Sequence, residues 1–450
     1  MKWKDTFVKI LVEICRVLLG VTFVFSGFVK TVDPYGTAYK IEDYLSAWSL
    51  SSFSFLALPT SIFLCALEFI MGAFMLLGIY RRWNSRLIFL TMCFMTILTL
   101  YLAIANPVED CGCFGDLWII TNWQTFYKNI VLLACSIFVI IHREKIGNFF
   151  TGKTYWLAFL FIIIFTFTFI LRNYYLDPLF DFRPYTIGTN ITEEMKVPEG
   201  KGRIEQNIMV YEKEGQKKEF TEENYPWEDD TWKFVEVKTK VLQEGEKAKI
   251  HDFTISALTF NKDLTEVLDR QDVTDEVLTD TGYVFLMISP SLLEMSNSHL
   301  SNLEDIAHYA NDYHYGFYCL TSSVTDDVMA WERDKVSNFN FALTDERTLK
   351  TIIRTNPGLL LIKNGIIINK WADVFVPAEE DLTKPLEGLS YSRMIDQKKT
   401  DSRNLLYITL IFVIPLLILK SLDLLFYRRR KGTAVAETDT NDNEDDKTEN

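Results

Sequence analysis

Residues 53–79 read FSFLALPTSIFLCALEFIMGAFMLLGI, an apolar run that a single charged side chain, Glu68, interrupts. Such a run is long enough to cross a bilayer, which needs about 20 residues at 1.5 Å rise per residue. Five further apolar segments of similar length occur along the chain, at residues 7–28, 87–104, 125–141, 155–171 and 405–427. A soluble core does not need so many uncharged runs, so the sequence predicts six transmembrane helices.

Charge divides the chain into two parts. Lys and Arg number 46 and Asp and Glu number 60, but only 24 of these charged residues fall within residues 1–172. A membrane part is therefore joined to a polar part, which excludes a cytosolic globular enzyme, a fibrous chain and a wholly disordered one. The formal net charge of −14 also disfavours nucleic acid as a partner, because phosphate binding needs concentrated Lys and Arg.

Basic residues indicate the orientation in the membrane. The N-terminal segment, the loops at 80–86 and 142–153 and the segment 428–431 together hold 13 Lys and Arg, whereas the opposite short loops hold only Lys30 and Lys40. Positively charged loops stay in the cytoplasm. We therefore expect a multi-pass protein of the cell inner membrane with both termini cytoplasmic and residues 173–403 periplasmic.

Three charged residues of the membrane part, Glu13, Arg16 and Glu68, lie away from the ends of its predicted helices. Intramembrane charges are costly and are usually paired. Counted from the inner ends of their helices, Arg16 and Glu68 lie at matching depths, which predicts an Arg16–Glu68 ion pair. Three interpretations stay open: a structural clasp between helices, a polar lining for a quinone or substrate head group formed by Arg16 and Glu68, or snorkelling of Glu13 and Arg16.

Two of the seven cysteines lie in a loop of the predicted outer face, Asp110-Cys111-Gly112-Cys113-Phe114-Gly115-Asp116. Neighbouring thiols in an oxidising compartment pair readily, and a bond across one intervening residue closes a tight, easily reduced ring. Cys111 and Cys113 are thus either a structural staple or a catalytic redox pair. A metal site is disfavoured, since the loop cannot supply four ligands. Asp110 and Asp116 oppose a thiolate, and Lys128 is the group that could offset them.

The membrane part resembles the DoxX family. Arg16-Val17-Leu18-Leu19-Gly20 and Ser26-Gly27-Phe28-Val29-Lys30 are similar to its first helix, Ala66-Leu67-Glu68-Phe69 is similar to its second, and Cys-Gly-Cys-Phe-Gly is similar to the MauE branch. The resemblance covers about residues 8–142 and implies a four-helix bundle. It also implies membrane redox work, because MauE-like proteins are linked to disulfide-dependent maturation of methylamine dehydrogenase and some DoxX relatives to quinone reduction.

Residues 251–376 alternate between predicted strands and helices, with short apolar runs at 283–288, 315–320, 359–362 and 366–371. Their order resembles a thioredoxin fold, in which Pro357 would be the cis-proline before a strand and Lys363-Asn364-Gly365 the following hairpin turn. Where that family carries Cys-x-x-Cys, this chain has Ser289-Pro290-Ser291-Leu292. The resemblance thus implies a domain that binds without redox chemistry.

The predicted organisation has six parts. These are a DoxX/MauE-like four-helix membrane domain (1–150), a fifth transmembrane helix (151–172), an extracytoplasmic linker region (173–250), a degenerate thioredoxin-like domain (251–403), a sixth transmembrane helix (404–431) and an acidic disordered cytoplasmic tail (432–450). The fold class is a multi-pass α-helical membrane bundle with an α/β outer domain. This added architecture resembles a group of DoxX-like proteins from Bacteroidota.

Two functions remain open. In the first, the chain is a thiol–disulfide or quinone-linked oxidoreductase that uses Cys111 and Cys113, with a quinone near Glu68 as acceptor. In the second, the bundle is a non-enzymatic scaffold in the lipid bilayer whose thioredoxin-like domain binds a periplasmic client.

Overall fold

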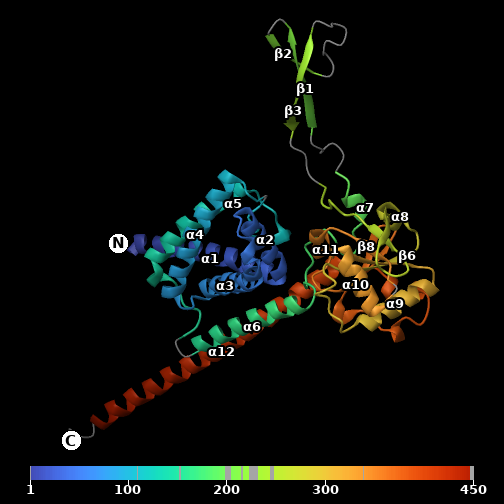
Figure 1. The fold of residues 1–450 in the computed structure, drawn as a ribbon. Coiled ribbons are helices and arrows are strands. Elements are labelled where there is room, and N and C mark those ends of the chain that lie inside the picture. Colours follow the sequence, from blue (N-terminus) through green and yellow to red (C-terminus); the bar gives the residue numbers. More distant parts are fainter. Residues whose placement is uncertain are drawn as a thin grey trace. The chain divides into compact units, whose positions relative to one another are not determined.

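A computed structural model describes residues 2–108, 110–151, 154–197, 204–213, 216–221, 232–243, 248–337 and 339–445. The chain divides into two compact units (Figure 1). Unit 1 comprises Met1–Arg183 and Asp396–Asn450, and unit 2 comprises Pro184–Ile395. The boundary at Arg183 falls within the Asp181–Tyr185 segment, which separates the apolar part of the sequence from the polar part.

Unit 1 is helical. Its helices are α1 (Lys2–Val32), α2 (Pro34–Ala47), α3 (Ala57–Leu77), α4 (Arg81–Ala105), α5 (Asn122–Ile141), α6 (Tyr155–Tyr175) and α12 (Gln397–Asp445), with 3-10 turns at Ser51–Leu56, Gly115–Leu117 and Arg143–Lys145. Within the described residues, five spans are long and apolar enough to cross a membrane: Ser51–Leu77, α4, α5, α6 and Gln397–Leu425. The chain is therefore a multi-pass membrane protein.

Helix α1 is not among these five spans, so the count of six helices remains a prediction. The helix is 31 residues long, which is ample for a crossing, but Glu13 and Arg16 interrupt its apolar sequence. It nevertheless contributes buried side chains to the centre of the bundle, including Val12, Leu19 and Phe23, which pack with residues of α3, α4 and α5.

Helices α1 and α3 approach each other closely through glycine. A Cβ atom on Gly27 would lie closer than 3.0 Å to the backbone of Phe69, and one on Gly72 would lie equally close to the backbone of Val24. Gly20 faces the side chain of Leu76, whose carbons would lie 2.6 Å from an added Cβ atom. Small residues permit such contacts between membrane helices, where dispersion forces dominate association. The contacts also fix the antiparallel register of the two helices.

One end of the bundle gathers the charged loops. Arg81 and Arg82 both pair with Glu144, at 3.0 and 2.8 Å, and Lys145 pairs with Asp5 at 3.0 Å. The N-terminus and the loops after α3 and α5 therefore share one end. The loop between α4 and α5, which carries the Cys-Gly-Cys sequence, lies at the opposite end.

A carboxylate on helix α12 anchors this helix to the rest of unit 1. Asp423 is 1% exposed and accepts hydrogen bonds from the backbone N–H of Thr151 at 3.0 Å and the hydroxyl of Thr154 at 2.8 Å. These contacts hold α12 against the start of α6, at the end of the bundle that carries the charged loops. This buried acid was not among the predicted intramembrane charges.

Helix α12 also continues through Asp445, into the segment that the sequence predicted to be a disordered tail. No proline follows Pro415 to stop the helix, and Ala434, Ala436 and Glu437 suit a helix that has already started. Residues 446–450 lie outside the described residues.

Unit 2 contains two sheets and short helices. Its strands are β1 (Ile204–Lys213), β2 (Gln216–Thr221), β3 (Lys233–Gln243), β4 (Ser256–Phe260), β5 (Val267–Asp272), β6 (Tyr283–Ser289), β7 (Gly316–Thr321), β8 (Phe341–Leu343), β9 (Gly358–Lys363) and β10 (Ile366–Ala372). Its helices are α7 (Ile191–Glu194), α8 (Thr274–Thr279), α9 (Leu300–Asp312), α10 (Thr325–Lys335) and α11 (Glu346–Ile352), with 3-10 turns at Asp373–Phe375, Glu379–Asp381, Leu386–Gly388 and Ser390–Ser392.

The larger sheet has the strand order β10-β9-β6-β7-β8-β4-β5. Strands β6, β7 and β8 are parallel, whereas β9 pairs antiparallel with both β6 and β10. The predicted hairpin is confirmed, because Asn364 and Gly365 both have positive φ between paired β9 and β10. The Asn356–Pro357 peptide bond is cis, as the sequence predicted.

The smaller sheet, with strand order β2-β1-β3, lies where the sequence predicted an irregular linker. All three strands pair antiparallel. The sequence Phe234-Val235-Glu236-Val237-Lys238 contains the apolar and polar positions of a strand, but the many charged residues around it obscured the pattern.

The register of α1 and α3 leads to a prediction about stability. We expect Gly27→Ala to destabilise the protein by about 1–3 kcal/mol, the usual cost of overpacking, because the added methyl group meets the backbone of Phe69. Thermal unfolding of the detergent-solubilised protein measures the change.

Gly147→Ala is the matched control, since the nearest atom to its added methyl group would be a Glu13 carboxylate oxygen at an ordinary 3.7 Å. Equal unfolding temperatures for Gly27→Ala and the wild-type protein would contradict the close approach.

Candidate functional site

The Cys-Gly-Cys loop brings two thiols together. The Sγ atoms of Cys111 and Cys113 lie 2.9 Å apart, and both residues are buried. Gly112 between them has φ +65°, a conformation that glycine adopts without steric cost. The pair that the sequence proposed as catalytic is thus preorganised for chemistry between two sulfurs.

Polar contacts hold the loop from the side of α2. Lys40 pairs with Asp110 at 2.8 Å, and the second oxygen of Asp110 accepts a hydrogen bond from the N–H of Gly112 at 2.7 Å. The hydroxyl of Tyr44 donates to the carbonyl oxygen of Cys111 at 2.9 Å. Asp110 therefore faces a cation and a backbone donor, which reduces the repulsion that we expected between its carboxylate and a thiolate.

Aromatic contacts hold the loop from the other side. The ring of Phe114 makes an edge contact with Phe25 at 5.3 Å between centroids and stacks on Trp118 at 5.6 Å. The Lys128 ammonium lies 4.2 Å from the centroid of the Phe114 ring, a cation–π distance. Lys128, the group that the sequence suggested could offset the aspartates, therefore lies beside the residue that follows Cys113.

Glu68 lies directly beneath the loop. Its carboxylate pairs with Lys30 of α1 at 2.6 Å, and its other oxygen lies 2.7 Å from the hydroxyl of Ser26. The same hydroxyl lies 2.7 Å from the carbonyl oxygen of Cys113. Ser26 thus connects the intramembrane carboxylate with the second cysteine of the loop.

The predicted Arg16–Glu68 pair is wrong. Arg16 instead pairs with Glu13 at 2.7 Å and donates to the carbonyl oxygen of Gly147 at 2.9 Å, at the end of the bundle with the charged loops. The depths of Arg16 and Glu68 were counted from the inner ends of α1 and α3, as if both helices ended at the same level. In the structure, α1 extends beyond the end of α3. The register that places Gly27 against Phe69 leaves Arg16 level with the end of α3 and places Glu68 near Lys30.

A cavity lies inside the bundle under the loop. It has a volume of about 40 Å³ and is lined by Ser26, Lys30, Glu68, Cys113, Lys128 and Asn129, with apolar residues of α1, α4 and α5. We call it the thiol cavity. Its size suits one or a few water molecules, each of which needs roughly 10–15 Å³.

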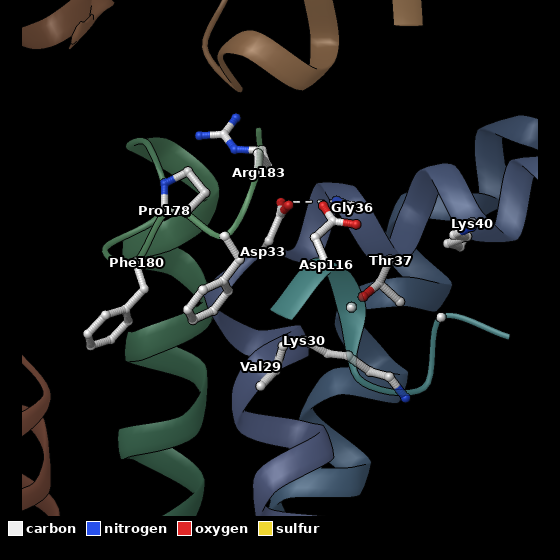
Figure 2. Close-up of a pocket in the computed structure, with 13 residues that line it drawn as sticks. Val29, Lys30, Asp33, Gly36, Thr37, Lys40, Asp116, Pro178, Phe180 and Arg183 are labelled. Atoms are coloured by element: carbon white, nitrogen blue, oxygen red, sulfur yellow. Dashed lines mark hydrogen bonds between the residues drawn. The ribbon is translucent and has the colours of Figure 1, made fainter. Parts of the chain in front are cut away.

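A second cavity, of about 30 Å³, borders the loop at Gly112 and Gly115 (Figure 2). Asp33, Lys40 and Asp116 contribute charges to its wall. Lys30 lines this outer cavity as well as the thiol cavity.

The surroundings of the loop give its two thiols different pKa values. The pKa of Cys113 is lowered to about 6, chiefly because the Cys111 thiol donates a hydrogen bond to its sulfur; burial opposes this effect, and Lys128 and Lys30 reinforce it. The same hydrogen bond, together with burial, raises the pKa of Cys111. Of the two thiols, Cys113 therefore ionises more readily, and the thiolate is the reactive form of cysteine.

Unit 2 offers no second thiol pair. Its single cysteine, Cys319 on β7, is fully buried, and burial raises its pKa. Ser289 stands where the thioredoxin family carries its Cys-x-x-Cys sequence. Its hydroxyl donates a hydrogen bond to the side-chain oxygen of Asn356 at 2.8 Å.

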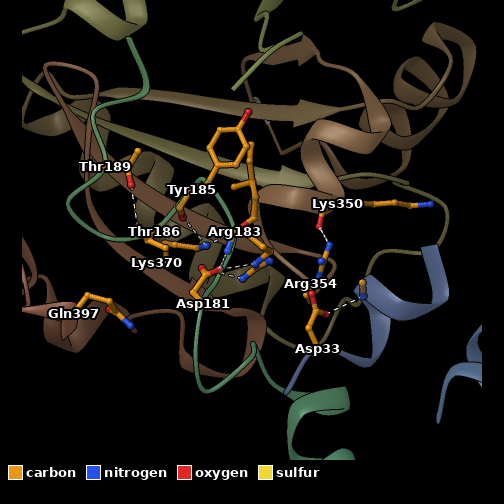
Figure 3. A network of polar contacts seen from close by, with 12 residues as sticks. Asp33, Asp181, Arg183, Tyr185, Thr186, Thr189, Lys350, Arg354, Lys370 and Gln397 are labelled. Atoms are coloured by element: carbon orange, nitrogen blue, oxygen red, sulfur yellow. Dashed lines mark hydrogen bonds and ion pairs between the residues drawn. The ribbon is translucent and has the colours of Figure 1, made fainter. Parts of the chain in front are cut away.

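Polar contacts away from the loop are shown in Figure 3. In unit 1, Arg183 binds Asp181 through two nitrogens, at 2.7 and 3.0 Å. In unit 2, the ammonium of Lys370 donates to the carbonyl oxygens of Tyr185 at 3.0 Å and Ile352 at 2.6 Å. Among the described residues, no cluster of three His, Cys, Asp or Glu side chains could hold a metal ion.

Residues 8–142 match the protein family of methylamine utilisation protein MauE. This match covers α1 to α5, the Cys-Gly-Cys loop and Glu68, and it supports a MauE/DoxX-like membrane protein. Residues 205–244, which include most of the smaller sheet, match a domain of unknown function (DUF8463). No curated protein matches the chain.

Sequence reasoning did not assign Ser26 and Lys30 to the site. Both occur in the Ser26-Gly27-Phe28-Val29-Lys30 motif that carried the DoxX resemblance. Their spacing of four residues places them on one face of α1. A serine inside an apolar helix, followed one turn later by a lysine, was the signal that could have assigned both residues to the site.

The positive charge of Lys128 should affect how readily Cys113 is alkylated. Because the Lys128 charge lowers the pKa of Cys113, Lys128→Gln should raise that pKa and shift the alkylation profile of Cys113 to higher pH. The thiolate, and hence the rate, increases as pH rises through the pKa. The rate with iodoacetamide, read by mass spectrometry of the Cys113 peptide, measures the shift.

Lys145→Gln, at the other end of the bundle, serves as the control. A Lys128→Gln profile that superimposes on that of Lys145→Gln would show that Lys128 does not act on Cys113.

Proposed function

We propose that the chain is a membrane thiol–disulfide oxidoreductase whose reacting groups are Cys111 and Cys113. The observation that carries the proposal is the 2.9 Å separation of their sulfurs in a buried loop that favours a thiolate on Cys113. Unequal thiols are suited to exchange, because one attacks while the other stays protonated until it is needed.

The exchange proceeds in two steps. The Cys113 thiolate attacks a disulfide of the partner protein, which forms a mixed disulfide and releases one partner thiolate. Cys111 then loses its proton and attacks the Cys113 sulfur, which closes the loop disulfide and releases the second partner thiolate. Two electrons pass to the partner, and a dithiol partner reverses the sequence.

The orientation of the chain follows the charges. The charged loops gather at one end of the bundle, and by the basic-residue rule that end is cytoplasmic. The Cys-Gly-Cys loop is then periplasmic, where disulfides persist. Helix α6 leads from the charged end to the loop end, so the chain enters unit 2 on the periplasmic side of the inner membrane.

Unit 2 serves as a client-binding domain of thioredoxin-like fold. The parallel pair β6–β7 and the antiparallel strands β9 and β10 support this fold. Because unit 2 lacks a thiol pair, the Cys-Gly-Cys loop supplies the chemistry and unit 2 supplies binding. The MauE match suggests that the client belongs to methylamine utilisation, for example a disulfide-bonded protein that matures in the periplasm.

A quinone is the alternative electron acceptor, near Glu68. The thiol cavity of about 40 Å³ is far below the roughly 300–1,000 Å³ of ligand pockets, so a quinone requires the bundle to open. A protein disulfide reacts at the loop itself, which favours thiol–disulfide exchange.

The second candidate function, a non-enzymatic scaffold, rests on the structural contacts of the loop with Lys40 and Tyr44.

Trapping tests the proposed exchange. In Cys111→Ser, the hydroxyl still donates to the Cys113 sulfur, but no thiol remains to resolve a mixed disulfide. We expect Cys113 to accumulate a covalent complex with its client, visible on a non-reducing gel, lost with reductant and mapped to Cys113 by mass spectrometry.

Cys113→Ser should trap far less, because burial still raises the pKa of the remaining Cys111. Cys319→Ser is the control for unrelated thiols. If neither loop variant traps a partner and the double alanine variant supports normal growth, the loop is a staple and the scaffold function holds.

A further inference from the structure

The two thiols of the loop are buried, although exchange with a client needs contact with one of them. Cys111 is 8% exposed and Cys113 is 7% exposed. Both pack in one cluster with Leu102 and Leu98 of α4 and with Tyr44 of α2. The rate of exchange depends on access to the sulfur that reacts. This conformation therefore keeps a protein disulfide away from the loop, and one of the elements packed on the loop has to move.

Helix α2 is tied to the bundle more weakly than α4. Helix α4 is a membrane span and contributes Ile88 and Met92 to the centre of the bundle, to which α2, described along its whole length, contributes no residue. The buried residues of α2 are Pro34 and Ala38, and none of residues 39–50 is buried. A segment that buries little apolar surface opens at a low cost in free energy. Of these two helices, α2 is therefore the one that can leave the loop.

Two polar contacts hold the second half of α2 on the loop. The ammonium of Lys40 pairs with the carboxylate of Asp110 at 2.8 Å, and both side chains are partly exposed. The hydroxyl of Tyr44 donates a hydrogen bond to the carbonyl oxygen of Cys111 at 2.9 Å. Water can replace the partner in either contact when α2 lifts, so neither contact prevents opening.

The start of α2 is fixed, and its end is a turn. The carbonyl oxygen of Pro34 accepts a hydrogen bond from Ser61 of α3 at 2.6 Å, and the ring of Tyr35 stacks on Tyr174 of α6 with 5.4 Å between centroids. After α2 the chain turns at Ser49, where φ is +59°, before the span Ser51–Leu77 begins. Residues 39–50 can therefore pivot about the start of α2 without displacing α1 or α3.

We propose that residues 39–50 form a lid on the Cys-Gly-Cys loop, which Lys40 and Tyr44 hold closed and which opens to admit the client. This inference rests on the proposed exchange function and names the regulation of the same site. The closed lid shields the two thiols from unrelated disulfides. The open lid removes Tyr44 from the cluster that buries Cys111 and Cys113, so that a client disulfide reaches them.

The first test compares a small and a bulky alkylating reagent on the reduced full-length protein. Iodoacetamide and a maleimide linked to polyethylene glycol both react with the thiolate, so the ratio of their rates at one cysteine reports access and is independent of the thiolate fraction. We expect Lys40→Met and Tyr44→Phe each to raise the bulky-to-small ratio about three- to fivefold, the population shift that follows the loss of one partly exposed polar contact. Lys40→Arg keeps the charge and should restore the wild-type ratio.

Lys145→Met is the matched control, since it breaks an ion pair with Asp5 at the other end of the bundle. It should leave the ratio at Cys111 and Cys113 unchanged. Wild-type ratios in both Lys40→Met and Tyr44→Phe, or an equal rise in Lys145→Met, would overturn the lid.

The second test needs no substitution. Hydrogen exchange of the wild-type protein, read by mass spectrometry, should be much faster for the amides of α2 after Tyr39 than for those of α3, because opening of the lid exposes the former to water. Exchange in this part of α2 that is as slow as in α3 would likewise reject the lid.

The outcome is separable from that of the proposed function. A client trapped by Cys111→Ser, together with unchanged reagent ratios in the Lys40 and Tyr44 variants, would reject the lid alone. Raised ratios and fast exchange of α2 without any trapped client would reject the exchange function and leave the lid in place.

Discussion

Helices α1 and α3 pack backbone against backbone where Gly27 meets Phe69 and Gly72 meets Val24. This contact sets the register that brings Lys30 to Glu68 and Ser26 to the loop. A larger side chain at Gly27 or Gly72 would separate the helices and remove the support beneath Cys113. The geometry of the site therefore depends on two glycines that take no part in its chemistry.

The buried ion pair then has an electrostatic role. A lone carboxylate at the depth of Glu68 would be costly in a bilayer, and the Lys30 ammonium offsets that cost. Lys30 and Lys128 also supply positive potential to a cysteine that burial alone would keep protonated. A single arrangement of charges thus stabilises the bundle and favours a thiolate at the end that carries the Cys-Gly-Cys loop.

Sequence patterns predicted the apolar helices, the β9–β10 hairpin and the cysteine pair, because each depends on local composition or spacing. The Arg16–Glu68 pair could not be predicted in this way. The register of two antiparallel helices is set by close contacts such as those of Gly20 and Gly27, and an offset of a few residues changes which charges meet. Helix α2 was missed because its mixed polar sequence lacks a long apolar run, although Asp33 followed by Pro34 is a helix-start signal.

Redox chemistry at the loop, with binding left to unit 2, is tested most directly by the redox state of Cys111 and Cys113 in intact cells. That state is read by acid quenching and stepwise alkylation of thiols before and after reduction. The account predicts that both forms are present and that their ratio shifts when cells are given a mild oxidant or reductant and recovers when it is removed. A pair that remains wholly oxidised or wholly reduced throughout would contradict the account.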